Sequence, residues 1–403
     1  MKEEKRLPKL GLIPKLILGL LIGIGIGLLD IDWMIRLTET GRVLLGGLIK
    51  FIIPLIIISF VAAAISEFGK RAGRLLSFTV GISYIDTIIA CALGAVVAYF
   101  VIPLFAIDSK SGAEAASIGA PFIEIEMTPI MSVMSALLIA FILGIGSTVV
   151  KGVTIKNAIS ELRDIVTLCI NKIILPILPF FIGCIFAGIT AKGELFSSIG
   201  IFGKMLILII VLQIVWLLIE YTVAGVISRN NPWKMFKAMI PAYFTALGTM
   251  SSAATLPVAL KQAKTVPYMK KSIADFVIPL CNTVHLSGAA MAITISAFTV
   301  SQMTTGQLPP IGVVVTFIIL LGIIEVGAVG VPGGSVLAAL GILQSSLGFD
   351  EAALGLMLTL FMIQDSFGTA TNVVGDGAIG MIVNKIFGKD KAAQTEVNNE
   401  IQL

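Results

Sequence analysis

The chain of 403 residues is 57% hydrophobic and 13% charged, with a mean hydropathy of +1.02. These values exclude an ordinary soluble domain and indicate a helical protein that crosses a lipid bilayer many times. The formal net charge is only +4, and no basic helix with interleaved aromatic residues suggests a nucleic-acid partner. The four cysteines are far apart and form no CxxC pair, so we expect neither a disulfide framework nor a zinc site.

Eight apolar runs are long enough to span a membrane, near residues 11–29, 44–65, 78–102, 127–150, 166–191, 199–227, 273–300 and 352–386. Lysine and arginine gather before the first run and after the second, fourth, sixth and eighth, which places both termini in the cytoplasm. No small-residue cleavage site follows the first run, so we interpret it as a retained helix. We therefore predict an all-α polytopic protein of the cell membrane.

Two further apolar segments, around residues 239–263 and 311–347, are each interrupted by a turn of small residues and proline, SSAATLP and GAVGVPGGS. The charge pattern stays consistent only if each enters and leaves on one side, the first from the cytoplasm and the second from outside. Re-entrant backbone is tolerated only inside protein or along a cavity, and a pair of interrupted segments is typical of a transporter with inverted repeats. The alternative is two full spans kinked at proline.

The last apolar run carries four polar residues, Asp365, Thr369, Asn372 and Asp376. Their spacing returns to nearly one face of a helix. An intramembrane carboxylate costs about 2.5–3.5 kcal/mol, so two on one face indicate a bound cation or ammonium group. The alternative is a pair of structural carboxylates bonded to neighbouring helices.

The seventh run contains His285 in a polar cluster that ends at Gly288, where a broken helix would free carbonyl groups for a cation. For His285 itself, a satisfied buried histidine competes with a ligand or a proton carrier. Asp86 in the third run and Glu325 before the second turn are further intramembrane acids and candidates for function. Glu325 has the alternative of lying at the extracellular mouth.

At these motifs the sequence resembles the dicarboxylate/amino acid:cation symporters, which include the glutamate transporters. The resemblance covers essentially the whole chain and is most specific at TMSSAATLPV (249–258), HLSGA (285–289), GAVGVPGGS (327–335) and DSFGTATNVVGD (365–376). It implies a homotrimeric, sodium-coupled symporter with eight transmembrane helices, two re-entrant hairpins, and a transport core that slides against a scaffold. Within the single unit 1–403, the scaffold would be residues 11–76 and 127–195, and the core 77–106 and 199–386, with hairpins at 233–264 and 310–347.

The resemblance also implies roles for individual residues. Asp365 would bind the amino group of the substrate and Asn372 its carboxylate, helped by backbone N–H groups around Ser251 and Ser252. The rest of the pocket would be lined by Val331, Gly368 and Thr369. Sodium would be bound by Asn372 and Asp376, by backbone oxygens near Thr283, Val326 and Ala328, and in a third place by Tyr84, Thr87 and His285.

The sequence also departs from the family. Acidic-substrate members carry an arginine where this chain has Gly368, or in the first hairpin where it has Met250. Without an arginine no motif residue pairs bidentately with a side-chain carboxylate, which favours a small neutral amino acid such as serine, threonine or alanine. The IQDS segment likewise resembles the bacterial sodium/serine-threonine branch. Gly368 also leaves extra volume, so the size of the substrate side chain stays open.

A second departure concerns the coupling ion. Ser287 stands where the family has the main carboxylate of the third sodium site. We therefore predict fewer coupled Na⁺ ions, with Asp86 as a substitute carboxylate and with H⁺ coupling through His285 as the alternative.

Three other functions fit parts of the sequence. Asp365 argues against a dicarboxylate or other organic-anion carrier, since a buried acid repels an anion that lacks an amino group. Two opposed re-entrant segments do not exclude the continuous pore of a channel. An intramembrane hydrolase would pair Ser251 or Ser252 with His285, but no oxyanion motif is evident, so we expect no enzyme.

Overall fold

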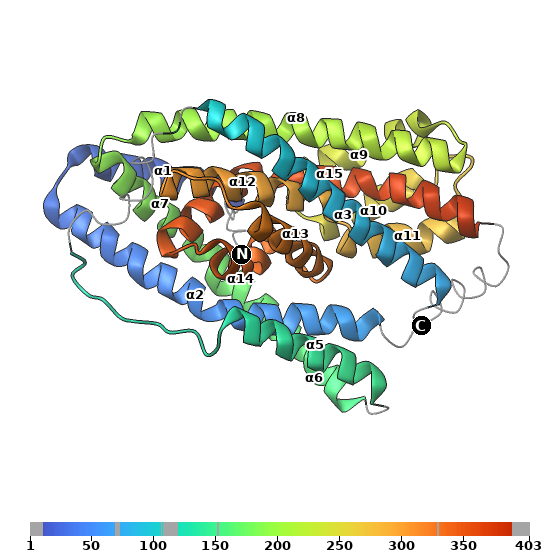
Figure 1. Ribbon diagram of the computed structural model, residues 1–403, viewed down its shortest axis with the longest axis horizontal. Helices are drawn as coiled ribbons and strands as arrows, with labels where there is room; N and C mark the ends of the chain where they lie inside the picture. Colours follow the sequence, from blue (N-terminus) through green and yellow to red (C-terminus); the bar gives the residue numbers. More distant parts are fainter. Residues whose placement is uncertain are drawn as a thin grey trace, which may run out of the picture.

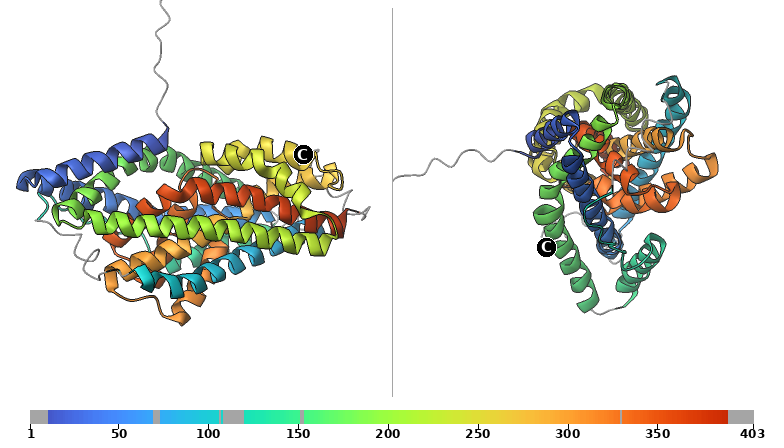
Figure 2. Two further views of the ribbon diagram at one scale, coloured as in Figure 1. Left: turned by 90° about the horizontal axis from the view of Figure 1, so that it is seen from above. Right: turned by 90° about the vertical axis from the view of Figure 1, so that its left-hand side faces the viewer.

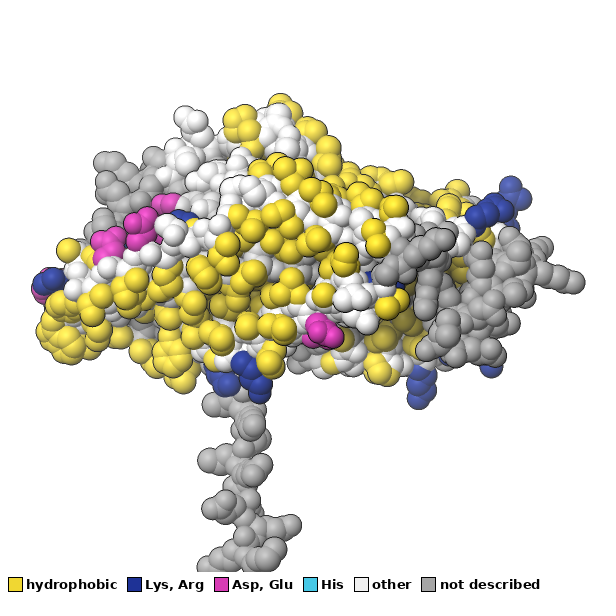
Figure 3. All heavy atoms as spheres, turned by 90° about the horizontal axis from the view of Figure 1, so that it is seen from below, with side chains coloured by type: hydrophobic (Ala, Val, Ile, Leu, Met, Phe, Trp, Pro, Cys, Tyr) yellow, Lys and Arg dark blue, Asp and Glu magenta, His cyan; other side chains and the backbone are white. Residues whose placement is uncertain are grey.

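The computed structural model describes residues 11–68, 73–105, 107, 120–150, 153–328 and 330–388, and every element among them is helical. In the described part of the chain, six stretches of helix are long and apolar enough to cross a bilayer, which confirms the predicted class of membrane protein. Apolar side chains cover most of the face in Figure 3, as expected for a surface in contact with lipid. The charged segment 1–10, used above for topology, lies outside the described residues.

The first packing group comes from the N-terminal half of the chain and forms one side of the molecule (Figures 1 and 2). Helix α2 (Asp32–Phe68) packs along α5 (Val133–Val149) and α7 (Leu175–Ala191), and α1 (Leu12–Leu29) also packs along α7. A π-helical turn, η2 (Ile170–Ile174), joins α6 (Thr154–Cys169) and α7 into one continuous rod. The group thus consists of α1, α2, α5, α6 and α7.

The second packing group surrounds the C-terminal helix α15 (Glu351–Phe387). It contains α3 (Arg74–Val101) with the short turn η1 (Ile102–Phe105), and α8 (Leu195–Ser228). The expected break in the seventh run is confirmed, since α11 (Lys271–Val284) and α12 (Ser287–Thr305) are separated by His285 and Leu286. The division of the chain into scaffold and transport core stays a prediction.

Both interrupted segments fold back as helical hairpins. The first consists of α9 (Pro232–Thr249) and α10 (Ser252–Ala263), the second of α13 (Ile311–Val326) and α14 (Gly334–Leu347), and the two helices of each pair pack against each other. The expected position of the first turn is wrong. It lies at Met250 and Ser251, with Met250 in the left-handed region (φ 52°), whereas Pro257 lies inside α10. The second turn includes Gly333 (φ 72°), as expected.

Two helices begin about twelve residues before their expected starts, because polar residues hid their first turns. In α2 the buried side chains of Glu39 and Arg42 form a two-contact pair, with Arg42 Nε 2.9 Å from Glu39 Oε2. In α6 an amphipathic stretch from Thr154 precedes the apolar run. The polar side chains of α2 are satisfied by a local ion pair, and those of α6 lie on an exposed face. A hydropathy average records neither effect and only lowers the score of these stretches.

The helix of the fourth run is shorter than expected, because α5 begins at Val133. Ser132 caps α5 by accepting a hydrogen bond from the Ser135 N–H at 3.2 Å, and the preceding residues are not helical. Helix α5 continues through Gly144 and Gly146 without a break. Gly144 instead allows close packing, because a Cβ there would lie 2.7 Å from the Cβ of Ile65 in α2.

Candidate functional site

The polar face predicted for the last apolar run is confirmed. Asp365, Thr369, Asn372 and Asp376 all lie in the continuous helix α15, and none is more than 6% exposed. Each is therefore a polar group inside the protein that needs a partner or a ligand.

Asp365 lies against the turn of the second hairpin, which in turn contacts the first hairpin. Its Oδ2 accepts a hydrogen bond from the Gly333 N–H at 2.7 Å. Ser251 Oγ, at the start of α10, donates to the carbonyl oxygen of Gly330 at 2.9 Å, so the two turns touch. Ser252 is buried beside Ser251, and Val331 lies in the second turn. The structure thus brings together the predicted substrate residues of both hairpins and of α15.

Asn372 connects α15 to the broken seventh helix. Its Oδ1 accepts hydrogen bonds from the backbone N–H groups of Gly288 at 2.8 Å and Ala289 at 3.2 Å. These are among the unpaired donors at the start of α12. Because the amide oxygen is occupied there, its NH₂ group is the part of the side chain that can donate to a ligand carboxylate.

Gly368 lies close to α12. A Cβ at Gly368 would lie 3.4 Å from Ala289 Cα and 3.4 Å from Gln364 Oε1, in ordinary van der Waals contact. Gln213 of α8 completes this layer, donating to the Gly288 carbonyl at 3.0 Å and to Gln364 Oε1 at 3.5 Å. The sequence analysis assigned no role to either glutamine. Each is a polar side chain inside an apolar run, the same pattern that singled out the acidic residues.

His285 lies at the centre of a second buried cluster. Its Nδ1 is 3.1 Å from Asp376 Oδ1, and its Nε2 is 2.9 Å from Asp86 Oδ2. The imidazole is fully buried at the break between α11 and α12. Asp86 therefore lies beside His285, where it was predicted as a substitute carboxylate. Both ring nitrogens of His285 are paired with acids.

Glu220 is the member of this cluster that sequence reasoning missed. It lies on α8, is 5% exposed, and its Oε1 accepts a hydrogen bond from Ser287 Oγ at 2.9 Å. The same oxygen is 3.8 Å from His285 Nε2. The signal was in the sequence, since IVWLLIEYTVAG carries one acid in an apolar run, like the run around Asp86.

Two of the other predicted sodium residues, Tyr84 and Thr283, form contacts outside this cluster. Tyr84 directs its hydroxyl to the carbonyl oxygen of Ile319 at 3.3 Å, towards α13 and away from His285. Thr283 donates to a carbonyl of its own helix. Thr87 is 1% exposed and its hydroxyl has no hydrogen-bond partner among the described residues. Val326 and Ala328 lie at the end of α13 and in the second hairpin turn.

Glu325 does not lie at an open mouth, because it is fully buried at the end of α13. A hydrolytic arrangement is also not formed in the described chain. Ser251 donates to a carbonyl group, whereas His285 is held by Asp86 and Asp376. A nucleophilic serine needs a base within hydrogen-bond reach. The Ser251 hydroxyl is bonded to a carbonyl oxygen instead, and both ring nitrogens of His285 are paired with carboxylates.

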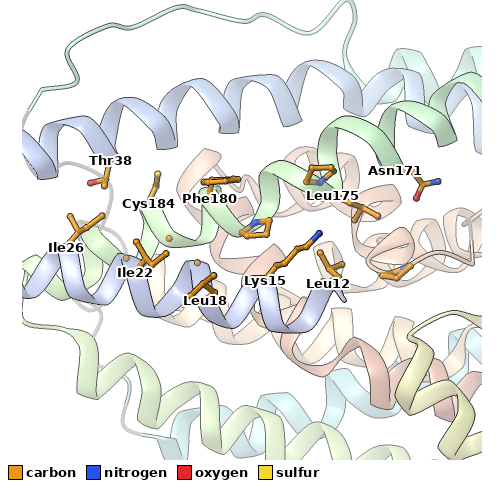
Figure 4. A pocket seen from close by; sticks show the side chains of 16 residues that line it. Leu12, Lys15, Leu18, Ile22, Ile26, Thr38, Asn171, Leu175, Phe180 and Cys184 are labelled. Atoms are coloured by element: carbon orange, nitrogen blue, oxygen red, sulfur yellow. The ribbon is translucent and has the colours of Figure 1, made fainter. Parts of the chain in front are cut away.

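An apolar groove of about 640 Å³ lies mainly between α1 and α7 (Figure 4), and its lining includes Pro332 of the second hairpin turn. Leu18, Ile22 and Phe180 line it, and Lys15 extends along it from α1. It lacks the convergent carboxylates and amides of α15, so we place the candidate site at the hairpin turns and the helix break.

Residues 12–386 match the sodium:dicarboxylate symporter family. Over 394 residues the chain is 26% identical to the serine/threonine transporter SstT of Enterococcus faecalis, covering 92% of this chain and 91% of the relative. It is 29% identical over 268 residues to the excitatory amino acid transporter 3 of Oryctolagus cuniculus, and 30% identical over 268 residues to that of Mus musculus. These alignments cover 66% of this chain, which spans about 50% of the length of these two relatives.

Proposed function

The chain belongs to the sodium:dicarboxylate symporter family, a family of transporters and not of enzymes, and we propose that it carries a small neutral amino acid, such as serine, threonine or alanine, together with Na⁺. The observation that carries this proposal is the buried carboxylate of Asp365 at the meeting point of both hairpin turns. The similarity to a serine/threonine transporter over 92% of the chain supports it.

The site has the chemistry of an amino-acid receptor. Asp365 would bind the ammonium group, and the NH₂ of Asn372 would donate to the carboxylate. Ser251 and Ser252 add the N-terminus of α10, where free backbone N–H groups favour an anion. Gly368, Thr369 and Val331 complete the lining. No arginine stands at position 368 or 250, so a second carboxylate on the substrate would lack a partner.

We propose Na⁺ as the coupling ion, with the carboxylate of Asp376 and a backbone oxygen of Asn372 as ligands of one ion. Backbone oxygens near Thr283, Val326 and Ala328 would bind another. Asp376 supports this assignment, because its Oδ2 is fully buried with no hydrogen-bond partner in the described chain. H⁺ coupling is the second candidate, favoured by the position of His285 between Asp86 and Asp376.

We further propose an elevator-type movement of the core, residues 77–106 and 199–386, against the scaffold of a homotrimer with cytoplasmic termini. One contact supports the movement. Glu351, the first residue of α15, has its Oε1 3.5 Å from Lys50 Nζ. Lys50 is 18 residues after the start of α2, about 27 Å along that helix. By the predicted topology both helices start outside, so the start of α15 lies well inward of the start of α2, as expected for a core displaced towards the cytoplasm.

Labels at positions 50 and 351 should therefore report more than one separation. We expect the short distance of this structure and a second, longer one in proteoliposomes with Na⁺ and substrate, measured by electron spin resonance. Labels at two scaffold positions, 43 and 127, serve as the control and should keep one distance. A single short distance under all conditions, with uptake intact, argues against the sliding core.

Uptake in proteoliposomes tests the proposed function directly. Radiolabelled serine, threonine, alanine and aspartate would each be offered with an inward Na⁺ gradient, and again with only an inward H⁺ gradient. We expect accumulation of at least one neutral amino acid above equilibrium, driven by Na⁺ and abolished by a sodium ionophore. A channel would equilibrate without accumulating. Uptake of aspartate alone contradicts the neutral substrate, and a response to H⁺ alone contradicts Na⁺ coupling.

A further inference from the structure

We infer that Glu220 is a ligand of a coupled Na⁺ ion, in a buried site where α8 and α15 meet the break between α11 and α12. The inference rests on the proposed sodium symport and adds a carboxylate from α8, which the motif residues do not include. Four observations on Glu220 and its neighbours carry it.

The first observation is an unsatisfied carboxylate oxygen. Glu220 is 5% exposed, and Ser287 Oγ bonds to its Oε1 at 2.9 Å. Its Oε2 is buried and has no hydrogen-bond partner in the described chain. Buried polar atoms are nearly always paired, and one that is not needs a ligand to explain it.

The second observation is the balance of charge. Asp86, Glu220 and Asp376 come from three different helices, and their only ion-pair partner among the described residues is His285. An imidazole supplies at most one positive charge against three carboxylates. Uncompensated charge in a low-dielectric interior costs far more than a paired charge, so the site favours an added cation.

The third observation is that further oxygens without partners surround the same helix break. They are Asp376 Oδ2, Asn282 Oδ1 and Thr87 Oγ1, all buried. On α3, Ser83 contacts Cys281 at 3.7 Å and Gly94 packs against Met291. Thr87 lies between them on the same face, and so faces the break at residues 285 and 286. Carboxylate, amide and hydroxyl oxygens are the ligands of a hard cation.

The fourth observation is the close approach of α8 to α15. A Cβ at Gly375 would lie 2.7 Å from Glu220 Oε2 and 2.8 Å from His285 Cε1. A side chain at position 375 would therefore force both groups to shift. The backbone of α15 thus accommodates the Glu220 carboxylate directly beside Asp376.

The test separates a ligand from a merely structural acid by moving the carboxylate. In Glu220→Gln we expect half-saturation by Na⁺ to rise at least tenfold, in uptake and in a binding signal that needs no transport. That signal is the change in tryptophan fluorescence on adding Na⁺, since Trp216 lies one turn before Glu220 on α8. In Glu220→Gln with Ser287→Asp, the carboxylate returns across a hydrogen bond of 2.9 Å, and we expect the sodium response to recover to within about threefold of the original protein.

The matched control is Glu220→Gln with Ser287→Asn, which has the same shape and no added charge, and should not recover. An unchanged sodium response in Glu220→Gln overturns the inference. So does a failure of Ser287→Asp to restore the response in a protein that remains folded by its thermal unfolding midpoint. The unaltered protein distinguishes the two proposals, because sodium binding without amino-acid uptake would contradict the proposed function and not the role of Glu220.

Discussion

Replacing Asp365 by Asn should weaken the apparent affinity for a neutral amino acid by about 10- to 150-fold, because a hydrogen bond to a charged group contributes about 1.5–3 kcal/mol. The change removes the charge that would bind the ammonium group. The asparagine keeps a side-chain oxygen that can accept a hydrogen bond from the Gly333 N–H. In the original protein the Gly333 nitrogen lies 2.7 Å from Asp365 Oδ2. The measurement is the concentration dependence of serine uptake in proteoliposomes at saturating Na⁺.

Asp164→Asn is the matched control for this change, since the Asp164 side chain is 72% exposed and far from the site in the fold. It should leave uptake unchanged. An Asp365→Asn variant with the original affinity for serine would show that the ammonium group binds elsewhere. Improved uptake of a dicarboxylate would point to the anion carrier, because a buried negative charge would then have opposed binding.

Replacing Asp376 by Asn should abolish Na⁺-driven accumulation, with a loss of at least about 100-fold, since breaking a buried charged pair costs about 3–5 kcal/mol. The Oδ1 of Asp376 is 3.1 Å from His285 Nδ1, and its Oδ2 is free for a cation. The variant removes the charge with almost no change in shape. Initial uptake rates would be measured over a range of Na⁺ concentrations at fixed substrate.

Asp275→Asn provides the control for this second change, because it breaks an ion pair with Lys264 that is only partly buried. Its sodium dependence should equal that of the original protein. An Asp376→Asn variant that retains full activity and the same sodium dependence would falsify the assignment of Asp376 as a Na⁺ ligand. Thermal unfolding midpoints would show whether a lost activity reflects unfolding instead.

Several features of the fold were predictable because they depend on short stretches of chain. The length of an apolar run decides whether it can span a membrane, and small residues at a turn allow a hairpin. The break at His285 and the second turn at Gly333 followed from such local patterns. The starts of α2 and α6 did not, since their polar residues are satisfied by pairing or by an exposed face, which a hydropathy pattern does not record.

The sequence by itself determined which side chains share the polar face of α15, because helical spacing is a local property. Only the tertiary structure decided what those side chains meet. His285 pairs with Asp86 from 199 positions away, and Glu220 reaches Ser287 across 67 positions. An apolar interior requires that every buried charge find a partner, but which partner it finds depends on how the helices pack. The sequence therefore placed acids in apolar runs, and the packing brought acids from three helices to one imidazole.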